Sequence, residues 1–252
     1  MAVNAELEAP GAEIAPLFAW HRTLRAIVEA GVEGRQGTIA RDDGAARITL
    51  GCYHVFGGDP ASPGARRLVE SADGPRELIY GNDPTWRVLI LDVLGERVFD
   101  RPMDEFDPSG LDDTALATVE ASLAPDFTLR PLDEDFASQL DRDLEPHGLQ
   151  VFSSPQQLAE EGLGVAIVSG DRLACAATSY THSSHYVEVA IATRLDFRSR
   201  GLAAVAAAAF LRECLRRNLE PCWSASNPVS KRLALRLGYR PGTECEVLYL
   251  RG

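Results

Sequence analysis

Two arginines, a glycine and the start of an alanine-rich stretch stand together in the segment Arg198-Ser199-Arg200-Gly201-Leu202-Ala203. Alternating β-branched residues over 187–191 predict a strand before it, and the stretch 202–218 predicts a helix after it. The first N–H groups of a helix have no partner inside it, and the helix dipole favours negative charge there. Gly201 would let the chain bend sharply and let phosphate oxygens approach the backbone. A strand, a basic turn and a helix start in this order therefore predict a binding site for phosphate groups.

The charge of the chain favours a small polyanionic ligand over a nucleic acid. The net charge is −12; residues 1–125 hold 11 basic and 21 acidic residues, and residues 126–252 hold 14 basic and 16 acidic residues. Within the second half, the stretch 194–240 has ten basic and three acidic residues. Such an excess attracts a polyanionic ligand, although helices with solvated basic faces are a commoner reason for it. The acidic remainder would repel the phosphate backbone of a nucleic acid.

The composition is that of a globular protein with one large domain or two small ones. The chain has 252 residues, of which 45% are hydrophobic, and this suffices for a real core. It has neither an apolar run of the roughly 18–20 residues that span a bilayer nor the regions of a secretory signal. Its five cysteines form no C-x-x-C pair, so neither a zinc site nor a disulfide framework is indicated. We therefore expect a cytoplasmic protein with no membrane association and no metal.

The pattern Arg198-x-x-Gly201-x-Ala203 resembles the coenzyme A pyrophosphate loop of the GCN5-related N-acetyltransferases, the GNAT family. The family writes this loop as Gln/Arg-x-x-Gly-x-Gly/Ala. The predicted strand Glu220–Ser226, the predicted helix Pro228–Leu237 and the sequence Leu237-Gly238-Tyr239 also resemble that family. The alternative interpretation is a β-α-β element with an incidental arginine-rich turn.

The resemblance implies the fold class and the domains. The element order expected over residues 126–252, β-α-α-β-β-β-α-β-α-β, is that of a GNAT fold, an α+β fold with a mixed sheet. The whole chain is similar to a bacterial GNAT subgroup in which an α+β region precedes this fold. We therefore expect an N-terminal α+β region over 1–125, with an acceptor-side or interface role, and a GNAT domain over 126–252.

Other predictions concern single elements. Residues 1–12 should be frayed, and apolar spacing over 13–31 predicts one helix. Residues 46–56 are expected to form the second strand of a hairpin, 96–113 a linker or surface loop, and 239–250 a single last strand. Ser62-Pro63 and Asp83-Pro84 are typical helix starts, and Gly95 a typical helix end.

The resemblance also implies which residues bind the donor, acetyl-CoA. The end of the central strand would pair with the pantetheine arm, the basic turn would bind the pyrophosphate, and two residues at the next helix start would contact the cofactor. These cofactor-binding residues are Ile191, Ala192, Thr193, Arg198, Ser199, Arg200, Gly201, Leu202, Ala203, Asn227 and Ser230.

Glu188 is the leading candidate for the catalytic base that deprotonates the amine. It lies on the central strand, close to where several members of the family carry a catalytic glutamate. A glutamate in an apolar strand is costly unless it is functional, paired or facing water, so a structural or substrate-orienting carboxylate is an equal alternative. His182 and His185 could act through water but are better explained as surface turn residues. His21 lies on an apolar stripe and fits a core histidine better than a catalytic one.

The usual general acid of the family is missing. Many members carry a tyrosine four residues before a glycine-aromatic pair, and here that position is Ala234. Tyr239 is too close to Gly238 to replace it and is expected in the core. Cys214 is expected to be a packing residue.

These observations favour an N-acetyltransferase that moves acetyl from acetyl-CoA to a primary amine by direct attack in a ternary complex. The acceptor would be a small molecule or a peptide, and the acidic first half would suit a cationic one. The alternative is a non-catalytic acyl-CoA-binding regulatory module, for which the missing tyrosine is the support. The chain could act as a homodimer.

Overall fold

The computed structural model describes residues 13–144 and 151–252, so the expectation for residues 1–12 lies outside the described residues. The chain divides into two compact units. The first consists of Met1–Arg22, Val28–Arg101 and Glu246–Gly252, and the second of Thr23–Ile27 and Pro102–Cys245. This division differs from the boundary expected after residue 125, because strands from each half of the sequence pair with the sheet of the other half.

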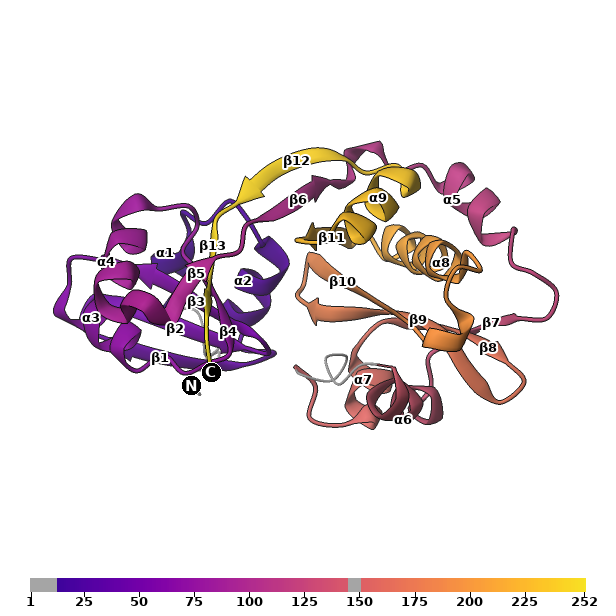
Figure 1. Cartoon of the computed structure of the whole chain (residues 1–252), viewed down its shortest axis with the longest axis horizontal. Helices are drawn as coiled ribbons and strands as arrows, with labels where there is room; N and C mark the ends of the chain where they lie inside the picture. Colours follow the sequence, from indigo (N-terminus) through magenta and orange to yellow (C-terminus); the bar gives the residue numbers. More distant parts are fainter. Residues whose placement is uncertain (1–12, 145–150) are drawn as a thin grey trace, which may run out of the picture. The chain divides into compact units, whose positions relative to one another are not determined.

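The first unit contains a six-stranded sheet in the order β1-β2-β3-β4-β13-β5 (Figure 1). Its strands are β1 (Thr38–Asp42), β2 (Ala45–Leu50), β3 (Tyr53–Gly58), β4 (Arg76–Ile79), β5 (Val98–Asp100) and β13 (Val247–Leu250). Its helical segments are α1 (Ala15–Phe18), most of α2 (Arg25–Val32), α3 (Pro63–Glu70), α4 (Pro84–Leu94) and η1 (Gly95–Arg97). Phe56, Leu78, Trp86 and Leu248 belong to its buried core, so strands and helices share one apolar interior.

Two sequence predictions for this unit are wrong. The helix expected over 13–31 is broken into α1 and α2, because Leu24 has a φ of 53°, a left-handed conformation that no helix interior accepts. The strand expected over 46–56 is an antiparallel pair, β2 and β3. Gly51, also with a φ of 53°, lies in the turn between them, where glycine adopts this conformation at little cost.

The predicted helix ends of this unit are confirmed. The Ser62 hydroxyl accepts the Ala65 N–H at 3.2 Å and opens α3. The Asp83 carboxylate accepts the N–H groups of Thr85 and Trp86 at 2.7 and 3.0 Å and opens α4. Gly95 is the C-cap of α4. These are local signals, because the side chain and the backbone it bonds lie within one helical turn.

The second unit contains a seven-stranded sheet in the order β12-β6-β11-β10-β9-β8-β7 (Figure 1). Only β10 and β11 run parallel among the described strands of this sheet. The strands are β6 (Met103–Asp107), β7 (Thr128–Pro131), β8 (Gly164–Ser169), β9 (Arg172–His182), β10 (Tyr186–Thr193), β11 (Glu220–Ala225) and β12 (Arg240–Cys245). The helical segments are η2 (Pro108–Gly110), α5 (Asp113–Glu120), α6 (Glu134–Asp143), α7 (Pro155–Glu161), η3 (Leu195–Phe197), α8 (Leu202–Arg216) and α9 (Pro228–Leu237).

Helices pack on this sheet through separate apolar clusters. Most of α8 is buried, and its alanines at 206, 207 and 208 are fully covered; small side chains let a helix approach a sheet closely. α6 and α7 pack in a different cluster with β8 and β9. The fold is therefore α+β with a mixed sheet, as the sequence predicts. No helix in the described residues is both long and apolar enough to cross a membrane.

Two further predictions are wrong, one for the segment 96–113 and one for the C-terminal segment 239–250. The segment 96–113 is not a linker: it contains β5 and β6, and β6 lies between β11 and β12. The many charged residues of this segment predicted a loop, but β6 is a strand with Met103 and Phe106 buried. The last strand expected over 239–250 is divided between β12 and β13, which belong to different sheets.

Candidate active site

The parallel strands β10 and β11 part shortly after they meet. They pair at three positions only, Tyr186–Glu188 against Glu220–Cys222. β10 stays paired with β9 as far as Thr193, so the separation occurs on its β11 side. A β-bulge between Glu188 and Val189 marks the same point on the β9 side. Bulges bend a strand and increase its twist, and this local geometry contributes to the opening between the two strands.

The basic turn follows the end of β10 and leads directly into α8. Gly201 is the N-cap of α8 with a φ of 78°, and no side chain caps this helix start. A Cβ at Gly201 would meet no heavy atom within 4 Å, so the backbone conformation alone favours glycine here. The Arg198 Nε donates to the Thr193 carbonyl at 3.2 Å and ties the turn to the strand. The uncapped N–H groups of α8 are thus available to an anion.

A groove of about 780 Å³ runs along this opening. Most of the predicted cofactor-binding residues line it, namely Ile191, Ala192, Thr193, Arg198, Ser199, Gly201, Leu202, Ala203, Asn227 and Ser230. Arg200 is not among its lining residues, and its guanidinium lies over the Phe197 ring at 5.5 Å. The lining also includes Trp223 and Arg236, which sequence reasoning missed. The register of arginines along α9 could have pointed to Arg236, because Leu233 and Arg236 lie one turn apart on a shared side.

Asn227 and Ser230 also organise the start of α9. The Asn227 Oδ1 accepts the Ser230 N–H at 2.8 Å as an N-cap. The Ser230 hydroxyl accepts the Trp223 indole N–H at 3.0 Å. Their presence at this position is therefore explained by the helix start and the Trp223 anchor, in addition to their place in the groove wall.

Glu188 lies where the strands part and is 4% exposed. Its Oε1 accepts the Ser224 N–H at 3.1 Å and the Ser224 hydroxyl at 2.6 Å. Its Oε2 is buried and has no hydrogen-bond partner among the described residues. Burial raises its pKa to about 7, against the lowering effect of Ser224 and with a further rise from the charge of Glu105. A carboxyl with such a pKa can accept and release a proton near neutral pH.

The other side chains that the sequence raised as candidates for catalysis are buried or form hydrogen bonds to the backbone. The Tyr239 hydroxyl donates to the Pro221 carbonyl at 2.9 Å, and burial raises its pKa well above 10. Ala234 is fully buried, and burial raises the pKa of Cys214 to about 12. His182 donates from Nδ1 to the Glu161 carbonyl at 3.2 Å. Tyr239 and Cys214 are therefore buried and protonated at neutral pH, and the proton of the Tyr239 hydroxyl is bonded to the backbone.

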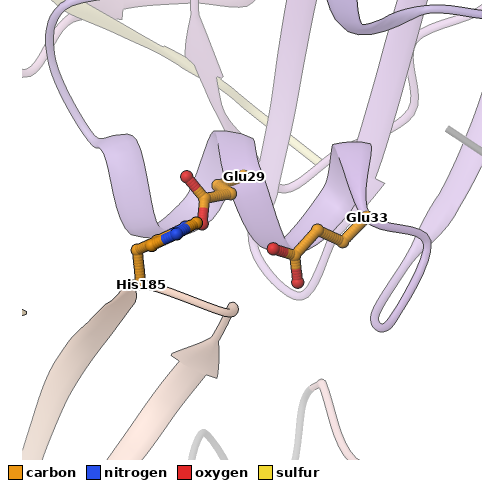
Figure 2. Close-up of side chains that lie close together, drawn as sticks. All are labelled: Glu29, Glu33 and His185. Atoms are coloured by element: carbon orange, nitrogen blue, oxygen red, sulfur yellow. The ribbon is translucent and has the colours of Figure 1, made fainter. Parts of the chain in front are cut away.

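Histidines and glutamates at two further places are residue types that can act as acids, bases or metal ligands. His21 is 7% exposed and donates from Nε2 to the Phe56 carbonyl at 2.8 Å, and burial lowers its pKa to about 4. This supports the core interpretation. Figure 2 shows Glu29 on α2 and Glu33 just after its end, together with His185 from the turn before β10. The glutamates belong to the first unit and His185 to the second, so we assign no metal site to them.

The fold and the groove define the class: a protein in which two parallel strands of a mixed sheet part beside the basic start of a helix. The model of the GNAT acetyltransferase family matches residues 15–248. The chain therefore belongs to the GNAT acetyltransferase family, whose members are acyltransferases.

The names of similar sequences and solved structures agree with this family assignment. The uncharacterized N-acetyltransferase YdfB of Bacillus subtilis strain 168 is 24% identical over 178 residues, which are 69% of this chain and 66% of the relative. The structure of a GCN5-related N-acetyltransferase-like protein from Streptococcus suis superposes with a TM-score of 0.83 at 25% identity, covering 96% of this chain and 98% of that one. A GCN5-related N-acetyltransferase from Kribbella flavida shares the fold, with a TM-score of 0.61 at 16% identity over 97% of both chains. The second and third comparisons span both units of this chain.

Proposed function

We propose that this protein transfers an acetyl group from acetyl-CoA to a primary amine by direct attack in a ternary complex. The observation that carries the proposal is the groove between the end of β10, the start of α8 and the start of α9. Its walls combine uncapped helix N–H groups, Arg198 and a strand edge that pairs with no residue of β11 after Glu188. A diphosphate suits the helix start, and an extended amide-bearing arm suits the strand edge.

The donor supplies an activated acetyl group as a thioester, and the protein supplies the proton transfer. The acceptor substrate arrives as an ammonium ion, and the Oε2 atom of Glu188 takes its first proton. No described residue forms a hydrogen bond with this oxygen. The amine nitrogen then bonds to the acetyl carbonyl carbon, and the bond from that carbon to sulfur breaks. The second proton of the nitrogen goes to the leaving sulfur, which departs as a thiol. Glu188 afterwards releases its proton to solvent.

The groove and the base lie next to each other along β10. Val189, the residue after Glu188, belongs to the groove lining. Backbone N–H groups of β10 beyond the bulge are the donors best placed to polarise the thioester carbonyl. The chain needs no tyrosine at position 234 for this scheme, because a thiolate is a good leaving group and receives its proton from the reacting nitrogen.

Calorimetry with acetyl-CoA and a thiol-release assay over a panel of primary amines test the proposal together. We expect binding of acetyl-CoA and thiol release that depends on both the amine and the enzyme. Binding without thiol release on any amine would support the regulatory-module alternative. Absence of binding would overturn both.

A further inference from the structure

One face of the second unit's sheet carries a row of polar side chains across three strands. Tyr186 is paired with Glu220, Glu188 with Cys222, and Ser224 with Glu105. Because side chains of directly paired residues lie on the same face of a sheet, the carboxylates of Glu188 and Glu105 share one face. The opposite face presents Trp223 and Phe106, which pack with α8 and α9 residues in one cluster. The polar row is therefore a separate surface from the helix-covered core.

Two of the three carboxylates in this row form no ion pair among the described residues. Glu220 forms an ion pair with Arg25, and Arg25 also donates to the Tyr186 hydroxyl at 3.0 Å and lies over its ring at 4.6 Å. In the part of the chain that the structure describes, neither Glu105 nor Glu188 forms an ion pair. Glu105 accepts only the Leu24 N–H, at 3.1 Å, among the described hydrogen bonds. The guanidinium of Arg25 thus bonds to Glu220 and Tyr186, and it acts on Glu105 only through its charge.

Two buried polar atoms on the same face also have no hydrogen-bond partner in the described part of the chain. Thr181 on β9 is paired with Glu188 on β10, so their side chains lie on the same face. Thr181 is fully buried and Glu188 is 4% exposed. Neither the Thr181 Oγ1 nor the Glu188 Oε2 has a hydrogen-bond partner within residues 13–144 and 151–252. Buried polar groups in native proteins are nearly always paired, so a donor group on a ligand is the expected partner.

The electrostatics of the row favour a cation. Burial raises the pKa of Glu105 and of Glu188. The charge of Glu105 raises the pKa of Glu188 further, and the charge of Glu220 raises that of Glu105. Leu24 and Arg25 partly offset this for Glu105. A positive charge placed beside both carboxylates would restore their ionised forms.

We propose that this face receives an acceptor with two positive charges, a diamine or an amine that also carries a guanidinium. The reacting amine lies at Glu188 Oε2 and Thr181 Oγ1, and the second cationic group pairs with Glu105. Glu105 is then a specificity-determining residue, supplied by β6, the strand that this chain inserts between β11 and β12. The proposal rests on the proposed acetyltransferase function.

The test compares linear diamines of three to six carbons with monoamines of the same carbon number. In the wild type we expect kcat/KM for the best diamine to exceed that of its monoamine by at least ~10-fold, because a charged hydrogen-bonded pair contributes about this much. Glu105→Gln keeps an oxygen for the Leu24 N–H but removes the charge. It should lower kcat/KM for the diamine by ~10- to 100-fold, mainly by raising KM. The kcat/KM for the monoamine should stay within about 2-fold of the wild-type value.

Asp104→Asn is the matched control. Asp104 is the preceding residue of β6, on the other face, and is ion-paired with Lys231, so its loss removes the same charge from the same strand. We expect it to preserve the diamine preference. The proposal is overturned if the wild type shows no preference for the diamine or if Glu105→Gln lowers kcat/KM for the diamine and the monoamine equally. It is also overturned if Asp104→Asn lowers the diamine preference as much as Glu105→Gln does. A wild type that turns over monoamines without preference overturns this inference alone, whereas one that turns over no amine also overturns the proposed function.

Discussion

Ser224 donates two hydrogen bonds, from its N–H and its hydroxyl, to the same carboxylate oxygen of Glu188. Glu188 is the last residue of β10 that pairs with the parallel strand β11, and Ser224 lies on β11 two residues beyond its pairing partner Cys222. The serine therefore links the strands where their backbones no longer do. It also orients Glu188 so that the other carboxylate oxygen is left for a further partner. The proton chemistry proposed for this protein depends on that arrangement.

The first prediction concerns the pH dependence of turnover. Glu188 must be ionised to accept a proton, and its pKa is raised to about 7. We expect kcat/KM to rise with pH and to level off above a midpoint near 7 in the wild type. Glu188→Gln should lower kcat by ~10²- to 10⁴-fold and abolish that midpoint. Glu220→Gln, which neutralises a carboxylate on the adjacent strand, should keep the midpoint; an unchanged profile in Glu188→Gln would remove Glu188 as the base.

The second prediction concerns the serine. Ser224→Ala removes the hydroxyl that donates at 2.6 Å and leaves the backbone N–H in place. Because that hydroxyl stabilises the ionised carboxylate, the midpoint of the pH profile should move up by ~1–2 pH units. Ser224→Thr restores a hydroxyl and should return the midpoint toward the wild-type value. A loss of activity that is the same at every pH would indicate a structural role only.

The third prediction concerns stability. Glu188 titrates near its ordinary value of 4.5 when unfolded and near 7 when folded, so the folded state binds more protons between these values. The free energy of unfolding should therefore fall as pH rises through this window, by up to about 3 kcal/mol. Glu188→Gln, which cannot ionise, should be close to wild type at pH 4.5 and more stable than wild type at pH 8. Urea unfolding at both pH values measures this, and a difference that does not change with pH would contradict it.

The fourth prediction concerns the basic turn. Gly201→Ala places an L side chain at a φ of 78°, in open space, at a cost of about 1–2 kcal/mol from the backbone alone. If α8 shifts its start to relieve this, coenzyme A binding should weaken by ~5- to 20-fold. Gly170→Ala is the control, because Gly170 has a φ of 60° and equally open space, in the turn between β8 and β9. Both variants should lose similar stability, and only Gly201→Ala should lose affinity in calorimetry.

The fifth prediction concerns the groove wall that sequence reasoning missed. Arg236 is part of the groove lining, whereas Arg232, one turn earlier on α9, is exposed outside it. Arg236→Ala should weaken coenzyme A binding by ~3- to 10-fold at low salt, and less at 0.5 M salt, because exposed charge pairs are screened. Arg232→Ala should change the affinity by less than about 2-fold. Equal effects of the two variants would mean that only the general charge of α9 matters.

The sequence alone determined the features that depend on neighbours within a few residues. Helix starts at Ser62 and Asp83, the αL glycine before α8 and the order of elements from β7 to α9 all follow from local backbone preferences and short side-chain reach. The turn proposed to bind an anion and the family resemblance are of this kind, since a strand, a turn and a helix start are contiguous in the chain.

Only the tertiary structure decided the pairings between distant segments. Glu105 is 119 positions from Ser224 in the numbering, yet the two are paired across β6 and β11. The charged segment 96–113 gave no strand pattern, because β6 is covered by strands on both sides and its apolar residues are only Met103 and Phe106. Leu24 breaks a helix that its apolar spacing predicted: its φ is 53°, and its N–H donates to Glu105, 81 positions away in the chain. Local propensity is a weak prior wherever long-range packing and hydrogen bonding choose the conformation, and the face that carries Glu188 and Glu105 is set entirely by such contacts.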